Sequence, residues 1–226
     1  MFRGRRSPRA LLLVVALGAW IGTFVPTAQA QSDAVAAPYC EPAAGTKLLY
    51  SNRAYEIEKK PIDAPLLYYT YKILAPSLHS QFVERRGQLL FDDGEDRWEV
   101  LSKEQEIRDF WPLQPAKTLV LRRFDRATRV KSKVHFQVLG LEPIDSGTHV
   151  YQSWKISRLD ENSDGTRFLQ FLWYAPEICT LSAFTDSQHR TVRLLRVLKP
   201  GDADYDRPLT VKKHQLYFAD RNEAVK

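Results

Sequence analysis

Residues 168–181 read FLQFLWYAPEICTL and form the densest apolar run of the chain outside its N-terminus. Because successive side chains of a β-strand point to opposite faces, residues 168–174 would present apolar groups on both faces of a strand. One face carries Leu169, Phe171 and Trp173, and the other carries Phe168, Leu172 and Tyr174. A strand of this kind must be covered twice. A strongly curved sheet with a helix or a second layer outside it meets that demand. Pro176 would end the strand, and Cys179 would begin the next one.

The chain beyond residue 47 consists of short apolar and aromatic runs that turn residues interrupt at intervals of roughly ten residues, which is typical of an all-β domain. In the run 133–139, Val134, Phe136 and Val138 alternate with His135 and Gln137, as expected of a half-buried strand. The run 102–110 (SKEQEIRDF) predicts one short helix. The predicted strands are 48–58, 66–74, 81–91, 97–101, 118–124, 131–139, 148–159, 166–174, 178–184, 191–198 and 211–218.

The connections between these runs are short and rich in turn-forming residues, at 92–94, 145–147, 162–165 and 200–202. Short turns join antiparallel neighbours. We therefore expect an all-β fold with minor α structure, a strongly curved antiparallel meander sheet or half-barrel with one short helix.

Residues 1–30 predict a cleaved secretory signal peptide. Arg3, Arg5, Arg6 and Arg9 form a basic segment, residues 10–25 are apolar and uncharged, and Ala28-Gln29-Ala30 is a small-x-small cleavage signal. The alternative is an uncleaved anchor, because residues 10–30 approach the length that spans a bilayer. Pro26 and the polar residues after it favour cleavage. The protein is therefore expected to be exported, to a periplasm or outside the cell.

The mature chain would comprise an extended N-terminal segment, 31–46, and a single β-rich domain, 47–226. It contains no second run of bilayer length, so it is not expected to span a membrane. The whole chain has 33 basic and 27 acidic residues. Because four arginines and no acid lie in residues 1–30, the remainder has 29 basic and 27 acidic residues. This near balance gives no indication of nucleic-acid or anionic-membrane binding.

Cys40 and Cys179 are the only two cysteines of the chain. An even number in an exported protein predicts a disulfide, worth about 4–5 kcal/mol by loop entropy. The alternative is two buried thiols. Neither cysteine has the paired Cys or His spacing of a metal site, and no metal or cofactor is expected.

Residues 160–165 read DENSDG and match the first six positions of a calcium-binding loop. Position 12 would be Phe171 instead of a bidentate Glu, and strands flank the loop in place of helices. A hairpin loop, in which Asp and Asn bond their own backbone and Gly165 takes a positive φ, is the favoured interpretation. A weak cation-binding loop is the alternative.

No local motif predicts a catalytic residue. The chain lacks a Gly-x-Ser-x-Gly elbow, and its five histidines are scattered. The candidate ligand-binding residues are aromatic, because rings exposed on one sheet face can line an apolar cavity or stack on sugars. Cross-strand packing in a core is the alternative for each ring. The candidates are Tyr69, Tyr71, Trp98, Trp154 and Trp173.

Three short motifs resemble a family of uncharacterised exported proteobacterial proteins with a domain of unknown function, whose pattern is W-P-L, V-x-G-x-E, G-T and W-Y-x-P-E-x-G. They are Phe110-Trp111-Pro112-Leu113, then Val138-x-Gly140-x-Glu142 with Gly147-Thr148, then Trp173-Tyr174-Ala175-Pro176-Glu177. The chain departs from the pattern at Cys179, where the family usually has Gly. The resemblance covers roughly residues 110–184. It implies a curved antiparallel sheet loosely similar to the half-barrel of periplasmic lipoprotein carriers, and it transfers no catalytic residue.

These observations predict an exported, non-enzymatic envelope protein that binds or carries a hydrophobic or amphiphilic, lipid-like ligand. One alternative is a glycan-binding surface module that uses the same rings as a stacking platform. A second is an envelope hydrolase with a dispersed His and carboxylate site. A purely structural or partner-binding role is a third.

Overall fold

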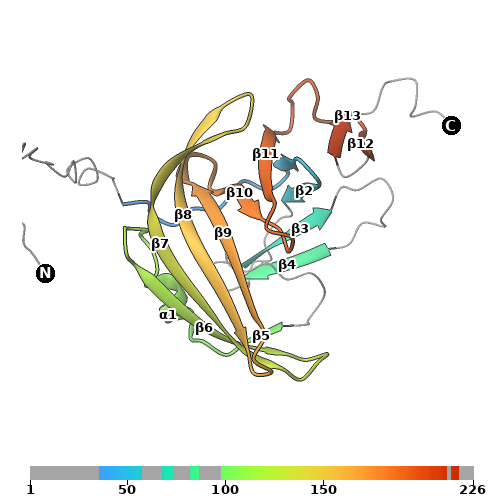
Figure 1. Cartoon of the computed structure of the whole chain (residues 1–226). Helices are drawn as coiled ribbons and strands as arrows, with labels where there is room; N and C mark the ends of the chain where they lie inside the picture. The colour runs from blue at the N-terminus through green and yellow to red at the C-terminus, as the bar shows by residue number, and fades with distance from the viewer. Residues whose placement is uncertain (1–35, 58–67, 74–81, 87–97, 213–214, 219–226) are drawn as a thin grey trace, which may run out of the picture. The chain divides into compact units, whose positions relative to one another are not determined.

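Alternating burial along the strands organises the fold. In β7 (Lys131–Asp145), Val134, Phe136 and Val138 are buried while Lys133 and Gln137 are exposed, which confirms the predicted alternation. β7 pairs with β6 (Thr118–Asp125) on one side and with β8 (Val150–Asn162) on the other, and β8 pairs with β9 (Arg167–Ala175). Figure 1 shows β7, β8 and β9 as long curved ribbons lying side by side.

The computed structural model describes residues 36–57, 68–73, 82–86, 98–212 and 215–218. The predicted signal peptide and the predicted turn at 92–94 lie outside the described residues. The remaining strands are β1 (Lys47–Tyr50), β2 (Ala54–Ile57), β3 (Tyr68–Ile73), β4 (Phe82–Arg86), β5 (Trp98–Val100), β10 (Thr180–Thr185), β11 (Thr191–Leu198), β12 (Leu209–Lys212) and β13 (Gln215–Phe218). The helices are α1 (Glu104–Arg108) and the 3-10 turn η1 (Pro176–Ile178).

Among the described residues, eleven strands form one antiparallel sheet in the order β4-β3-β2-β1-β11-β10-β9-β8-β7-β6-β5. This order confirms the predicted all-β class with minor α structure. The sheet consists of two meanders, β1 to β4 and β5 to β11. They join where β1 pairs with β11, through register partners such as Leu48 and Val197. The two edge strands, β4 and β5, are consecutive in the sequence.

Two predicted strands prove to be hairpins. Residues 48–58 do not form one strand, because the chain turns at 51–53, where the Tyr50 amide donates to the Arg53 carbonyl at 2.8 Å, and returns as β2. Residues 211–218 likewise fall in β12 and β13, which pair with each other as a separate two-stranded sheet. The predicted short helix at 102–110 is confirmed as α1.

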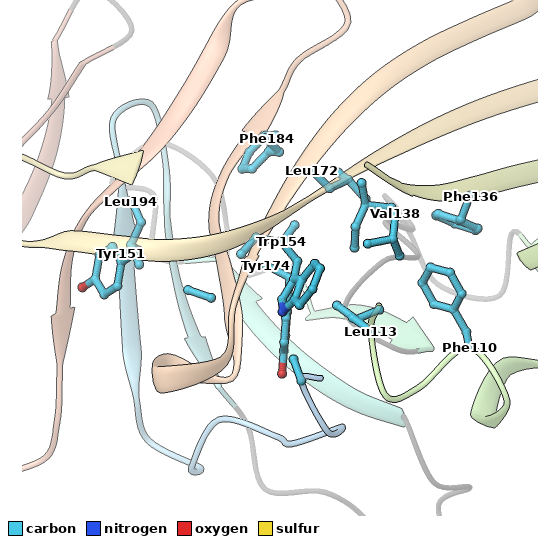
Figure 2. Packing of buried hydrophobic residues seen from close by; sticks show 14 of the residues in the cluster. Phe110, Leu113, Phe136, Val138, Tyr151, Trp154, Leu172, Tyr174, Phe184 and Leu194 are labelled. Atoms are coloured by element: carbon cyan, nitrogen blue, oxygen red, sulfur yellow. The ribbon is translucent and has the colours of Figure 1, made fainter. Parts of the chain in front are cut away.

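The core lies on one face of the sheet, here called the covered face, which carries Val134, Phe136 and Ile156. Phe110 and Leu113, which follow α1, pack against this face, and both are at most 1% exposed. Figure 2 shows Phe110 beside Phe136 and Leu113 beside Val138, with Trp154 and Tyr174 in the same cluster.

β9 is covered on both faces over only part of its length. Leu172 and Tyr174 belong to the core of the covered face. On the opposite face, Trp173 is buried with Ile144 and Ala183 in a smaller cluster. Leu169, two positions before Phe171, is 41% exposed. The second layer expected over the first half of this strand is therefore missing at Leu169.

The N-terminal segment is fixed to the body of the domain at two points. Ala37 and Leu113 form an isolated antiparallel bridge and exchange backbone hydrogen bonds of 3.2 and 2.8 Å. Cys40 and Cys179 form the predicted disulfide, with their Cα atoms 5.2 Å apart. Cys179 has a φ of 53°, the left-handed conformation that favours glycine.

Among the described residues, no helix has the length and hydropathy needed to span a bilayer.

Candidate functional site

Four neighbouring strands place charged side chains in one row. Arg122 of β6 lies opposite Lys133 of β7, Lys133 opposite Glu161 of β8, and Glu161 opposite Arg167 of β9. Directly opposed residues of an antiparallel pair project from the same face of the sheet. The face that carries this row is opposite to the covered face and is here called the open face. The charged row therefore presents three cations and one anion to the solvent side of β6 to β9.

A pocket of about 790 Å³ lies at this end of the sheet, around the β8–β9 hairpin. Five basic residues and one acid line it, namely Arg122, Arg123, Lys131, Lys133, Arg167 and Glu161. Leu101, which is 45% exposed, contributes an apolar wall. Its amide donates to the Arg122 carbonyl at 2.7 Å, so it lies next to the charged row.

The cations of the pocket differ in their partners. Arg167 lies 2.8 Å from Glu161, and Arg122 lies 3.7 Å from Glu106, a residue of α1. Within the part of the chain that the structure describes, Lys131 and Lys133 have no carboxylate at ion-pair distance. Both ammonium groups are thus available to a ligand.

Two residues that line the pocket, Arg123 and Ser132, belong to a buried ionic network on the covered face. The Arg123 guanidinium donates to Asp160 Oδ2 at 2.7 Å and to Ser132 Oγ at 2.9 Å. Arg158 donates to both oxygens of Asp160 at 2.9 Å. Arg123, Arg158 and Asp160 are each at most 7% exposed. Because a buried charge is costly unless it is paired, these bonds fix the side chains at the ends of β6 and β8.

The network also decides between the two interpretations of residues 160–165. Asp160, the first ligand position of the candidate calcium loop, accepts from two arginines. The Asp164 carboxylate accepts from the backbone and hydroxyl of Thr166 at 2.9 and 2.7 Å, and Gly165 has a φ of 85°. Hydrogen bonds from Thr166 lower the pKa of Asp164. The segment is the hairpin turn, and no metal-binding cluster of His, Cys, Asp or Glu occurs among the described residues.

A row of three aliphatic side chains and one histidine, here called the apolar row, adjoins the charged row on the open face. Val120, His135, Leu159 and Leu169 are consecutive register partners across β6, β7, β8 and β9. Each lies two positions along its strand from a member of the charged row, which corresponds to about 7 Å. Val120 is 45% exposed and Leu169 is 41% exposed. The open face therefore combines a basic pocket with an exposed apolar strip.

The structure separates two of the predicted ligand-binding rings. Trp154 is 1% exposed and belongs to the core of the covered face. Trp173 is 7% exposed on the opposite face, where its indole N–H donates to Glu142. The Lys155 ammonium lies 5.2 Å from the Trp173 ring centroid and 3.3 Å from Glu142. Contact of either ring with a ligand stays a prediction.

The other three predicted rings lie at positions where only the backbone is described. Tyr69 and Tyr71 are two positions apart on β3, and Tyr71 is the register partner of Val83 of β4. Trp98 begins β5 and lies opposite Asp125 of β6. β5 is the neighbour of β6, whereas β3 is separated from β6 by most of the sheet. The five rings do not lie on one group of adjacent strands.

Two histidines lie near carboxylates. His135 Nε2 is 2.9 Å from Glu161, and His149 Nε2 is 3.2 Å from Glu177. The His149 ring contacts Tyr151, whose pKa is raised by burial and by the charge of Glu177. Glu161 also pairs with Arg167 at 2.8 Å. Among the described contacts, neither histidine ring bonds a Ser, Thr or Cys side chain, as a nucleophile and base pair would require. The His149 backbone amide donates to Ser146 Oγ at 3.0 Å.

Sequence reasoning missed the basic pocket, since its residues come from four separate strands and no local motif connects them. Comparison with known proteins adds no assignment, because no protein-family model, curated protein or solved structure matches the chain.

Proposed function

We propose that this protein is an exported, non-enzymatic binding or carrier module for an amphiphilic ligand. The polar head of the ligand occupies the basic pocket, and its apolar tail lies over Val120, Leu159 and Leu169. The observation that carries the proposal is that the apolar row lies on the same face of β6 to β9 as the charged row, whose members Arg122, Lys133, Glu161 and Arg167 line the pocket.

The geometry suits a head and a tail that are joined directly. The rows are about 7 Å apart, and the apolar row crosses four strands, or about 14 Å at 4.8 Å per strand. Each methylene that leaves water contributes about 0.8 kcal/mol. The affinity is therefore expected to rise with tail length until the tail spans the row.

The placement of the rings favours an amphiphile over a glycan. A glycan platform needs exposed ring faces, whereas Trp154 and Trp173 are both at most 7% exposed. The hydrolase alternative would draw on the His135–Glu161 and His149–Glu177 pairs, and among the described contacts neither histidine ring bonds a nucleophilic side chain. Export is part of the proposal and is supported by the Cys40–Cys179 disulfide, because disulfides persist in oxidising compartments.

The test is a calorimetric titration of the mature chain with dodecyl maltoside and with dodecyl phosphate, each below its critical micelle concentration. Both amphiphiles are expected to bind. Val120→Thr and Leu169→Gln are each expected to weaken binding about tenfold, equivalent to about 1.4 kcal/mol of lost tail contact.

Val150→Thr is the matched control, since Val150 is 53% exposed but lies outside the apolar row, at the start of β8. Unchanged affinity in the Val120 and Leu169 variants, or equal loss in the Val150 variant, would contradict the proposed site. Failure of both amphiphiles to bind would remove the proposed function.

A further inference from the structure

We infer that the headgroup of the ligand is a phosphate monoester or an anion of the same charge and shape, held by Lys131, Lys133 and Arg122. This inference rests on the proposed function, because it specifies the polar half of the same site.

The negative charge of the headgroup is inferred from the ion pairs that the pocket residues form, or do not form, within the protein. Arg123 and Arg167 each have a carboxylate within 2.8 Å. Lys131 and Lys133 have none among the described residues, and the Arg122 pair is open, at 3.7 Å, with both side chains largely in solvent. Three cations can therefore turn to a ligand without breaking a close ion pair.

The three cations are placed to converge. Lys131 and Lys133 alternate with Ser132 on β7, so both project from the open face, and Arg122 is the register partner of Lys133 on β6. Opposed Cβ atoms in such a pair are about 5 Å apart. Long side chains from these positions can reach one group of oxygens between them.

The number and kind of donors select the anion. A phosphate monoester carries about −1.5 to −2 at pH 7 and three acceptor oxygens. A guanidinium forms paired hydrogen bonds with phosphate, and lysine binds it as a point charge. A carboxylate offers two oxygens and one negative charge, so it would leave part of the hydrogen-bonding capacity of the two lysines and Arg122 unused.

Asn162 also lines the pocket, but its register partner is Ser132, so it projects from the covered face. Its Nδ2 donates to Thr166 Oγ1 at 2.8 Å. The three cations of the open face therefore define the headgroup site without it.

The experiment compares ligands that share a tail or share a head. The mature chain is titrated with dodecyl phosphate and dodecyl maltoside as monomers, with inorganic phosphate, and with phosphatidylglycerol vesicles. Dodecyl phosphate is expected to bind at least about tenfold more tightly than dodecyl maltoside, and added salt is expected to reduce this advantage. Inorganic phosphate and the vesicles are expected to bind weakly.

Single charge-removing variants locate the effect. Lys131→Gln and Lys133→Gln are each expected to lower the affinity for dodecyl phosphate several-fold and to lower that for dodecyl maltoside by a smaller factor. Lys199→Gln, which removes the same charge from an exposed turn outside the pocket, is expected to change neither.

Each contrary result has a separate meaning. Equal affinity for the two dodecyl ligands would overturn the anionic headgroup and leave the amphiphile site standing. Inorganic phosphate that binds as tightly as dodecyl phosphate would overturn the amphiphile function and leave an anion site alone, because the tail would contribute nothing. Binding to vesicles alone would replace the single-molecule ligand with a bilayer surface and overturn the inference.

Discussion

Asp160 has a position in the structure that its sequence context only partly indicates. It opens the polar segment DENSDG, which reads as a solvated loop. It nevertheless shares the covered face with Ile156 and Arg158, because all three have the same parity on β8 and all are buried. Its carboxylate consequently joins two guanidinium groups in place of water.

Replacement of Asp160 should strongly destabilise the protein. Asp160→Asn removes the charge between two buried arginines, and breaking a buried pair by loss of one partner costs about 3–5 kcal/mol. Urea unfolding followed by tryptophan fluorescence measures the change. Asp164→Asn, in the exposed turn of the same hairpin, is expected to cost less than about 1 kcal/mol. Similar losses from the two substitutions would show that the network does not hold this end of the sheet.

At the scale of the element, alternation predicted most of the sheet. The strands that correspond to β6 to β11 were located from period-two patterns and short turns, since an antiparallel sheet with one covered face imposes that period. The hairpin at 51–53 was missed because Ser51-Asn52-Arg53 interrupts a run that is otherwise apolar at both ends. Four-residue strands are too short for alternation to mark their limits.

The candidate site could not be predicted in the same way. Arg122, Lys133, Glu161 and Arg167 each occupy an alternate, solvent-facing position, where charged residues are the ordinary choice. Their arrangement depends on register, which the hairpin turns set and which local patterns do not report. One sequence signal could have located them. The turn at 162–165 fixes the register of β8 against β9, and the pairing of β6 with β7 extends that register, so the residues opposite one another can be counted from strand to strand.

The β10–β11 turn depends on Asp186. Its Oδ1 accepts from the amides of Gln188 and Arg190 at 2.9 Å, and its Oδ2 accepts from Arg190 Nε at 2.8 Å. Burial tends to raise the pKa of Asp186, but the hydrogen bonds from Arg190 and Gln188 outweigh this effect and hold the pKa below its ordinary value. The ionised carboxylate therefore stabilises the folded state.

Asp186→Asn is expected to cost about 1–3 kcal/mol at neutral pH. A lowered pKa contributes stability above the unfolded value of about 3.9, and this contribution is lost as the pH falls through the lower folded value. The difference between wild type and variant should accordingly shrink on acidification, in urea unfolding from pH 7 downward. Gln188→Ala, at an exposed side chain in the same turn, serves as the control. If the difference in unfolding free energy between wild type and Asp186→Asn does not change with pH, the loss comes from altered hydrogen bonding or packing and not from the carboxylate charge.

At the scale of the whole molecule, the disulfide and the β1–β11 pairing connect residues far apart in the sequence. Cys40 and Cys179 are separated by 139 positions. The predicted single meander could not include the β1–β11 pairing, because strand-to-turn patterns report only neighbours along the chain. The cysteines were the one sequence feature that joined the N-terminal segment to the second half of the chain.

Loss of the disulfide is expected to lower stability substantially. In the chain-entropy model, a loop of this length contributes about 4–5 kcal/mol. The Cys40→Ser and Cys179→Ser double variant is expected to unfold at lower urea concentration than wild type, and dithiothreitol should shift wild type to the same midpoint. The Ala37–Leu113 bridge remains in the variant, so the covered core should still form. A urea midpoint that neither the double substitution nor dithiothreitol changes would show that the disulfide contributes no stability.

The most direct test of the central claim is amide chemical-shift mapping of the mature chain during titration with monomeric dodecyl phosphate. The proposed site predicts that shifts concentrate on the open face, at 120–122 of β6, 131–135 of β7, 159–162 of β8 and 167–169 of β9. Residues of the β10–β11 turn, such as Asp186 and Arg190, should stay unchanged. Shifts that centre on other strands, or that spread uniformly over the sheet, would contradict an amphiphile site on this face.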